Sequence, residues 1–181
     1  KKLVASGNIK GKNGDFLIDK FKINLGPENR INLDGYVAGV TNLQNLKTDL
    51  TISNSQLQKD LLLSLSPEDQ DLSDYQIPPK LGMEGKITGN EKAVDIDAKF
   101  ITDYGNLNFD GIIENVSSDS LRSFAGNIMT EKFQVNKFFV EDMGLGMVSA
   151  DIKLAADATF SKLNAEGYIA EIEYQNYLYR N

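Results

Sequence analysis

The chain is 181 residues long and carries a formal net charge of −7, from 19 basic and 26 acidic residues. It contains neither cysteine nor histidine, which excludes disulfides, Cys/His zinc sites, thiol nucleophiles and imidazole bases. The acidic balance is unsuited to nucleic acid and to anionic headgroups. The longest apolar runs, residues 61–63 and 138–140, are far shorter than the roughly 20 residues that span a bilayer.

Residues 1–66 are predicted to form a first repeat unit of four strands and a short helix. Apolar residues alternate with polar ones from Leu3 to Gly11, and the same period returns in residues 16–25 and 31–37. A period of two is typical of antiparallel strands with one apolar side and one side in water. The unit therefore predicts a sheet with two chemically different faces.

The end of this unit has helical spacing. Ser55 and Gln58 resemble a capping box, and the run stops at Pro67. The leucines between share one helical face: Leu57, Leu61, Leu62 and Leu65. The pattern predicts a short amphipathic helix over residues 56–65, and residues 134–139 repeat it more weakly.

Residues 67–80 are predicted to link the first unit to the second, because they combine acidic residues with two consecutive prolines. Carboxylates in this segment are oxygen ligands of the kind that calcium prefers: Glu68, Asp69, Asp71 and Asp74. The run lacks the spacing and the central glycine of an EF-hand loop. We expect a solvated loop, with no bound metal and no cofactor.

A second unit is predicted over residues 81–147. Residues 81–89 match residues 3–11 in the order of their apolar residues and glycines, and residues 107–113 match residues 31–37 in the same way. Repeats of this kind indicate stacked units, none of which buries its apolar side alone.

A truncated third unit is predicted over residues 148–181, where the alternation returns from Val148 to Leu154 and from Leu163 to Ile169. We expect all the units to form one continuous domain. Because the sequence opens and ends within the repeat pattern, we expect it to be a fragment of a longer protein.

The fold class that these patterns predict is all-β. We expect a repetitive antiparallel sheet, curled into a U-shaped trough or folded as a sandwich, with one or two short helices. The glycines of the repeated segments fall on the apolar side, where they contribute no burial. A bulge, a bend or the close approach of another backbone would explain them, and so would ordinary turns at strand ends.

Two groups of residues offer chemistry. The first contains acidic residues that each precede a repeated glycine: Asp34, Glu84, Asp110 and Glu166. They fall on the polar side of their strands, whereas a catalytic carboxylate pair needs two different environments, so we expect no enzymatic activity. The second contains aromatic residues near the C-terminus: Tyr168, Tyr174, Tyr177 and Tyr179. Such residues stack on sugars or pair across a terminal hairpin.

Three stretches carry a family resemblance: residues 81–89, 104–111 and 167–179. Their repeated apolar–acid–glycine pattern, which extends from Leu3 to Tyr179, resembles the AsmA-like/TamB superfamily of bacterial cell-envelope proteins, Bacteroidetes members in particular. The resemblance implies a long trough with an apolar interior, a periplasmic location and an inner-membrane anchor outside this segment. It also implies intermembrane phospholipid transport or outer-membrane biogenesis, with outer-membrane assembly proteins as candidate partners and no catalytic residues.

An apolar wall holds a lipid tail without any specific polar group, since about 14 methylenes gain on the order of 11 kcal/mol on leaving water. We therefore interpret the chain as a non-enzymatic segment that holds or conducts lipid acyl chains. The residues predicted to contact lipid are Leu33, Val37, Ile87, Val94, Ile96, Phe100, Phe109 and Ile113. Two alternatives stay open: an ordinary sandwich core without a ligand, and an envelope or surface adhesion module that binds glycan or protein.

Overall fold

The computed structural model describes residues 3–65, 73–159 and 161–181. The elements follow one another as β1 (Leu3–Lys12), β2 (Asp15–Leu25), β3 (Arg30–Ala38), the 3-10 helix η1 (Leu43–Asn45), β4 (Lys47–Gln58), α1 (Lys59–Leu65), β5 (Lys80–Asn90), β6 (Ala93–Thr102), β7 (Gly105–Glu114), β8 (Ser123–Gln134), α2 (Val135–Phe138), β9 (Leu145–Asp157), β10 (Leu163–Tyr174) and β11 (Tyr177–Arg180).

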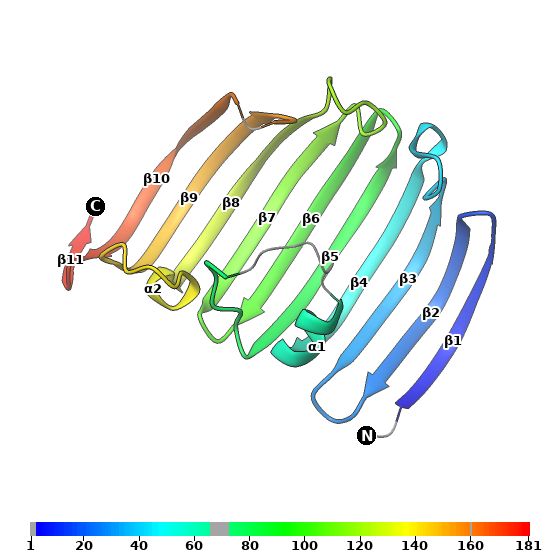
Figure 1. Cartoon of the computed structure of the whole chain (residues 1–181), viewed down its shortest axis with the longest axis horizontal. Coiled ribbons are helices and arrows are strands. Elements are labelled where there is room, and N and C mark those ends of the chain that lie inside the picture. Colours follow the sequence, from blue (N-terminus) through cyan, green and yellow to red (C-terminus); the bar gives the residue numbers. More distant parts are fainter. Residues whose placement is uncertain (1–2, 66–72, 160) are drawn as a thin grey trace.

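All eleven strands form one antiparallel sheet, in which each strand pairs with its neighbours in sequence (Figure 1). The first and last strands lie at opposite ends, so the sheet is open. The prediction of an all-β antiparallel sheet with short helices is confirmed. Of the two forms expected, the sandwich is not adopted, because the described strands belong to a single sheet.

The order of elements has a regular pattern. Four strands and a short α-helix, β1–β4 with α1, are followed by four more strands and a second short helix, β5–β8 with α2. Both helices lie on the same side of the sheet in Figure 1. The last three strands, β9–β11, continue the sheet in the same antiparallel order.

The first helix begins later than its sequence pattern predicts. Residues 56–58 continue β4, and Gln58 is paired with Lys80 of β5. Ser55 is no helix cap, because its hydroxyl accepts a hydrogen bond from the Asn32 amide at 2.9 Å. Cross-strand pairing therefore prevails over the local helical spacing, and α1 starts at Lys59. The second helix is likewise shorter than residues 134–139.

The repeated glycines lie where neighbouring backbones approach closely. A Cβ atom at Gly35, which has a φ of 123°, would collide with the carbonyl of Asp49 on β4. A Cβ atom at Gly85 would meet the Asp97 carbonyl of β6, and one at Gly167 would meet the Asp151 carbonyl of β9. Of the explanations expected for the repeated glycines, these three positions support the close approach of a neighbouring backbone.

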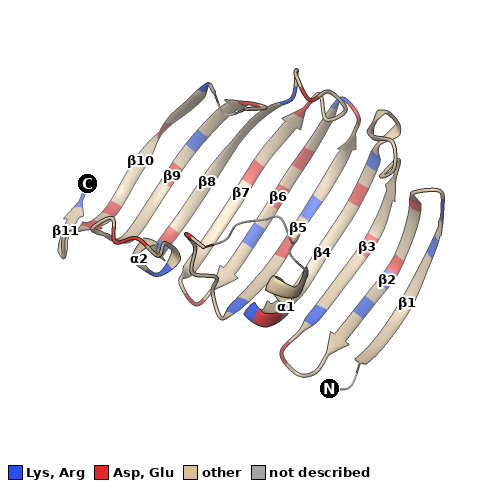
Figure 2. Ribbon diagram, viewed as in Figure 1, with Lys and Arg blue, Asp and Glu red and all other residues tan. Residues whose placement is uncertain are grey.

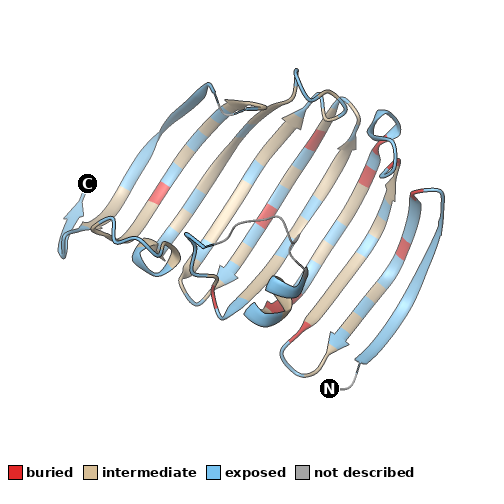
Figure 3. Cartoon of the chain, in the orientation of Figure 1, coloured by how far each residue is buried: buried red, intermediate tan, exposed pale blue. Residues whose placement is uncertain are grey.

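The sheet has no thick core. Apart from the run of Ser55, Gln56 and Leu57 at the end of β4, the buried residues are scattered singly (Figure 3), and the most buried apolar side chains among the described residues keep 7–9% of their surface exposed. Every residue of β1 is exposed. Each described strand is covered mainly by its neighbours in the sheet, so most apolar side chains are half-buried.

Candidate functional site

The eight residues predicted to contact lipid lie on one face of the sheet, on strands β3, β5, β6 and β7. The strand register places them in rows that run across the strands. Val94 pairs with Ile113, and Ile87 pairs with Ile96. Leu33 and Phe109 belong to one row, which passes through Gly85 on β5. Val94 is buried, and the other seven are half-buried. The structure therefore brings all eight onto one continuous surface.

Three adjacent rows, each running from β3 to β10, define this surface, which we call the apolar face. The first row is Val37, Thr48, Gly89, Val94, Ile113, Phe124, Ala156 and Leu163. The second is Gly35, Leu50, Ile87, Ile96, Gly111, Gly126, Leu154 and Ala165. The third is Leu33, Ile52, Gly85, Ala98, Phe109, Ile128, Ile152 and Gly167.

No position in these rows is charged. The single polar side chain, Thr48, donates a hydrogen bond from its hydroxyl to the Ile87 carbonyl at 3.4 Å, so it offers little to a polar ligand. Glycines are interspersed with large residues in all three rows, and Gly111 and Gly126 lie side by side in the second, which makes the surface uneven. Chemically, the apolar face can bury hydrocarbon and can do little else.

Charged residues recur along most strands (Figure 2). The strand register places charged side chains on the opposite face, which we call the polar face. One of its rows runs Asp34, Thr51, Lys86, Asp97, Asp110, Asn127, Lys153 and Glu166. Lys86 also forms an ion pair with Asp49 at 3.2 Å, and both side chains are about half exposed. Such exposed pairs contribute little to stability.

The four carboxylates considered for catalysis lie apart on the polar face. Asp34 is on β3 and Asp110 on β7, four strands away, a separation of roughly 19 Å at the usual strand spacing. Glu84 and Glu166 are on β5 and β10. None of these carboxylates lies on a strand next to another, so they form no pair.

The acidic segment falls largely outside the described residues, which end at 65 and resume at 73. Glu68, Asp69 and Asp71 lie in that gap. Asp74 is described, and its backbone carbonyl accepts a hydrogen bond from the Val140 amide at 3.0 Å. Within the described ranges, no group of three or more acidic residues is placed to hold a metal ion.

The C-terminal tyrosines do not form one platform. Tyr168 lies opposite Asp151, on the polar face, with about half of its surface exposed. Tyr174 pairs with Tyr177 across the β10–β11 hairpin, and Tyr179 pairs with Ile172. Tyr174, Tyr177 and Tyr179 therefore take part in the cross-strand pairs of the terminal hairpin.

One end of the apolar face is overlaid by three segments, which we together call the cover: α1, residues 73–79 (the strap) and α2. Tyr75 of the strap forms a β-bridge with Phe139, just after α2. The ring of Phe138 lies 5.4 Å from that of Tyr75 and 6.0 Å from that of Phe133 on β8. The cover thus joins the first helix, the linker and the second helix over the sheet.

Sequence reasoning did not identify the cover as part of the site. Its signal is present in the apolar run at residues 138–140, but the partner of that run is some sixty residues away in the chain. Local patterns do not report pairings over such a distance.

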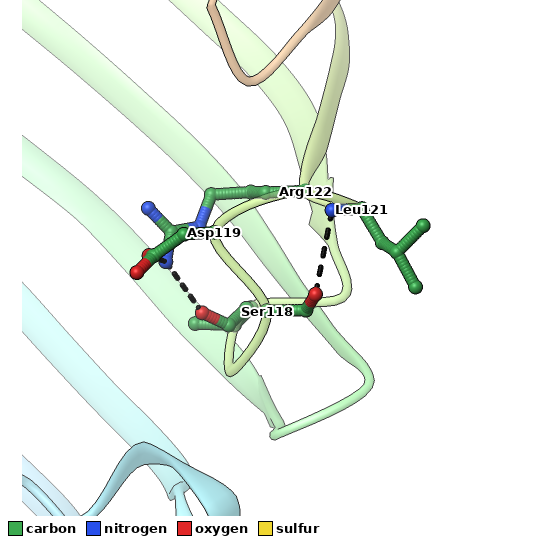
Figure 4. A network of polar contacts seen from close by, with 5 residues as sticks. Ser118, Asp119, Leu121 and Arg122 are labelled. Atoms are coloured by element: carbon green, nitrogen blue, oxygen red, sulfur yellow. Dashed lines mark hydrogen bonds and ion pairs between the residues drawn. The ribbon is translucent and has the colours of Figure 1, made fainter.

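Compact loops close the other end of the strands. In the β7–β8 loop, Arg122 Nη2 donates to the Asp119 carboxylate and to the Val116 carbonyl, both at 2.9 Å (Figure 4). The Leu121 amide donates to the Ser118 hydroxyl at 3.3 Å. These hydrogen bonds join residues within the loop, whereas the cover packs against the sheet.

Comparisons of the chain with protein-family models, curated proteins and solved structures find no match. The resemblance to the AsmA-like/TamB superfamily therefore stays a prediction. Among the described residues, no helix has the length and apolar character needed to cross a membrane, the longest α-helix being the seven residues of α1.

Proposed function

We propose that this chain is a non-enzymatic segment of a cell-envelope protein that holds or conducts lipid acyl chains along its apolar face. The observation that carries the proposal is the apolar face itself: three adjacent rows of eight positions without a charge, in a single-layered sheet. Monomeric proteins seldom expose a contiguous apolar surface of more than a few hundred Å², and such surfaces mark interaction sites.

The chemistry of this face favours hydrocarbon over a polar ligand. Most of its side chains are half-buried, so they stand to gain from a further layer of apolar contact. At about 0.8 kcal/mol for each methylene removed from water, one lipid tail supplies a large driving force without any hydrogen bond. The charged side chains of the polar face favour contact with water, so hydrocarbon is expected to bind to the apolar face alone.

Location and wider role are parts of the same proposal and rest on the family resemblance. A periplasmic segment, anchored in the inner membrane through a part of the protein outside this chain, would take part in intermembrane phospholipid transport or outer-membrane biogenesis. Outer-membrane assembly proteins are its candidate partners. The repeated order of four strands and a helix supports this role, because it extends one apolar surface along the molecule.

The test uses two aspartate substitutions on adjacent parts of β6. Ile96 lies in the middle row of the apolar face, and Lys99 lies on the polar face. The purified chain is incubated with vesicles of phosphatidylethanolamine and phosphatidylglycerol, and bound lipid is counted by native mass spectrometry. Ile96→Asp should lose most of the bound lipid, because an unpaired ion against an acyl chain costs several kcal/mol.

Lys99→Asp is the matched control and should bind lipid as the wild type does. Circular dichroism establishes that both variants are folded. A folded Ile96→Asp variant with wild-type lipid content would contradict the proposed function.

A further inference from the structure

A cavity of about 510 Å³ lies between the cover and the sheet. Residues from both sides line it, among them Leu81, Phe100, Leu107, Leu63, Ile77 and Phe138. This volume falls within the roughly 300–1,000 Å³ of ordinary small-molecule sites. The cavity is thus large enough to receive a ligand, and side chains of both the cover and the sheet line it.

The side chains that the structure describes in the lining offer nothing to a polar group. Among the described residues of the lining, the single polar side chain is Thr102, whose hydroxyl donates to the Gly105 carbonyl at 2.8 Å and accepts from the Tyr104 amide at 3.0 Å. Because this hydroxyl is already engaged, a headgroup placed inside the cavity would lose its hydrogen bonds to water and gain none. Only a hydrocarbon ligand is stabilised there.

Backbone hydrogen bonds hold the cover together without using the cavity. The Gln76 amide donates to the Phe138 carbonyl at 2.7 Å, and the Val140 amide donates to the Asp74 carbonyl at 3.0 Å. The Lys59 amide, at the start of α1, donates to the Pro79 carbonyl at 3.0 Å. The strap is therefore fixed to both helices, so its apolar side chains are held over the sheet.

The cavity is continuous with the apolar face. Phe100 is the next same-side residue after Ala98 on β6, and Leu107 is the same-side neighbour of Phe109 on β7. Ala98 and Phe109 belong to the third row of the apolar face. A chain lying along the face can therefore extend beneath the cover without crossing a charged position.

We propose that the cavity receives the terminal part of one hydrocarbon chain of a lipid, whose headgroup stays outside the cover. This inference rests on the proposed function, since the chain would reach the cavity along the apolar face. It adds a discrete site with a stoichiometry of one. It also implies little selectivity among headgroups, because the described part of the lining has no free polar side chain with which to recognise them.

Single tryptophan residues can report on the site, because the chain has no tryptophan of its own. Phe138→Trp places the fluorophore in the cavity lining on α2, and Phe133→Trp places one in the lining on β8 in case the first variant does not fold. Phe109→Trp reports on the open apolar face, and Tyr168→Trp on the polar face. The probe is stearic acid brominated in the distal half of its chain, since bromine quenches only nearby tryptophan.

We expect quenching of the cavity reporter that saturates at one fatty acid per protein. Quenching of Phe109→Trp alone would overturn this inference and leave the proposed function standing. Quenching at neither position would overturn both. Equal quenching of Tyr168→Trp would show general adsorption of the fatty acid and would overturn the assignment of the cavity.

A filling variant tests the same site in the opposite direction. Ile77→Trp places an indole in the cavity and should weaken the binding of unbrominated stearic acid about tenfold, a loss of about 1.4 kcal/mol by calorimetry. Leu121→Trp, at an exposed position of the β7–β8 loop, should bind as the wild type does. Unchanged affinity in a folded Ile77→Trp variant would contradict the site.

Discussion

The ring of Phe109 lies against two paired glycines. A Cβ atom on Gly111 would lie 2.5 Å from Phe109 Cζ, and one on Gly126 would lie 2.9 Å from Phe109 Cε2. Gly111 and Gly126 face each other across β7 and β8. The absence of side chains at both positions makes the hollow that this aromatic ring occupies, and the ring in turn shields the exposed backbone.

A double-mutant cycle tests this packing. Gly111→Ala should destabilise the fold by about 1–3 kcal/mol, because the new methyl group overlaps the ring. In the background of Phe109→Leu the same substitution should cost less, with a coupling energy of about 0.5 kcal/mol or more in urea unfolding. Strict additivity of the two substitutions would show that the ring does not lie on the glycine.

Asp157 ends β9 and gathers donors from the turn that follows. The Ser161 hydroxyl donates to its carboxylate at 2.6 Å, and the amides of Ser161 and Thr159 donate at 2.9 Å and 3.2 Å. The Ser161 hydroxyl is the chief cause that lowers the pKa of Asp157 below its ordinary value. Because the pKa is lower in the folded state, the ionised carboxylate favours folding.

Asp157→Asn should therefore lower the midpoint of thermal unfolding at neutral pH. The difference from the wild type should shrink below about pH 4 and vanish once the carboxylate is protonated in both states. Differential scanning calorimetry over a series of pH values measures it. Asp103→Asn, which removes a charge from the β6–β7 turn, is the control, and identical pH profiles for the two variants would contradict the role given to Asp157.

At the scale of elements, irregularities in β4 and β8 are equivalent. The register shifts between Ile52 and Ser55 in β4, and between Thr130 and Phe133 in β8. Each irregularity contains a residue in the left-handed region, Asn54 with a φ of 43° in the first and Lys132 with a φ of 50° in the second. The irregularity in β4 is followed closely by α1, and the one in β8 by α2. Both irregularities therefore come just before the chain leaves the sheet.

Lys132→Gly should stabilise the fold by about 0.5–1 kcal/mol, since glycine avoids the left-handed strain of roughly 1–2 kcal/mol and loses part of that gain through its greater entropy when unfolded. Lys153→Gly, at an extended and exposed position of β9, should instead destabilise by about 0.5–1 kcal/mol. Chemical unfolding of both variants provides the comparison. Destabilisation by both would place Lys132 in an ordinary strand conformation.

The sequence predicts strands and faces well because their signal is local. A period of two in β6 separates Val94, Ile96 and Ala98 from Asp95 and Asp97, and the structure puts them on opposite faces as the period requires. The onset of α1 is harder, since Leu57 fits a strand and a helix equally well. Its assignment to β4 depends on pairing with Leu81, more than twenty residues away.

The cover lies beyond local patterns for a stronger reason. The bridge between Tyr75 and Phe139 joins segments separated by the whole of β5–β8. Hydrophobicity at residues 138–140 shows that these side chains seek burial, but not what they pack against. The eight predicted residues thus describe the open part of the surface and reach the cavity only at Phe100.

At the scale of the whole molecule, the two faces of one sheet divide the chemistry. Charges lie on the polar face, and the three rows of the apolar face cross eight strands without one. A single layer leaves most of this surface half-buried, and among the described residues the cover overlies one end of it. The proposed function therefore predicts that lipid acyl chains occupy this face and not the other.

Site-specific photo-crosslinking to lipid distinguishes the two faces. A photoreactive amino acid replaces Val37, Ile96 or Phe109 on the apolar face, and in matched variants Asp19, Asp97 or Lys99. After incubation with phospholipid vesicles and illumination, mass spectrometry detects lipid bound covalently to the protein. Crosslinks at the first three positions and not at the other three are the expected result, whereas equal crosslinking on both faces, or none on the apolar face, would contradict the account.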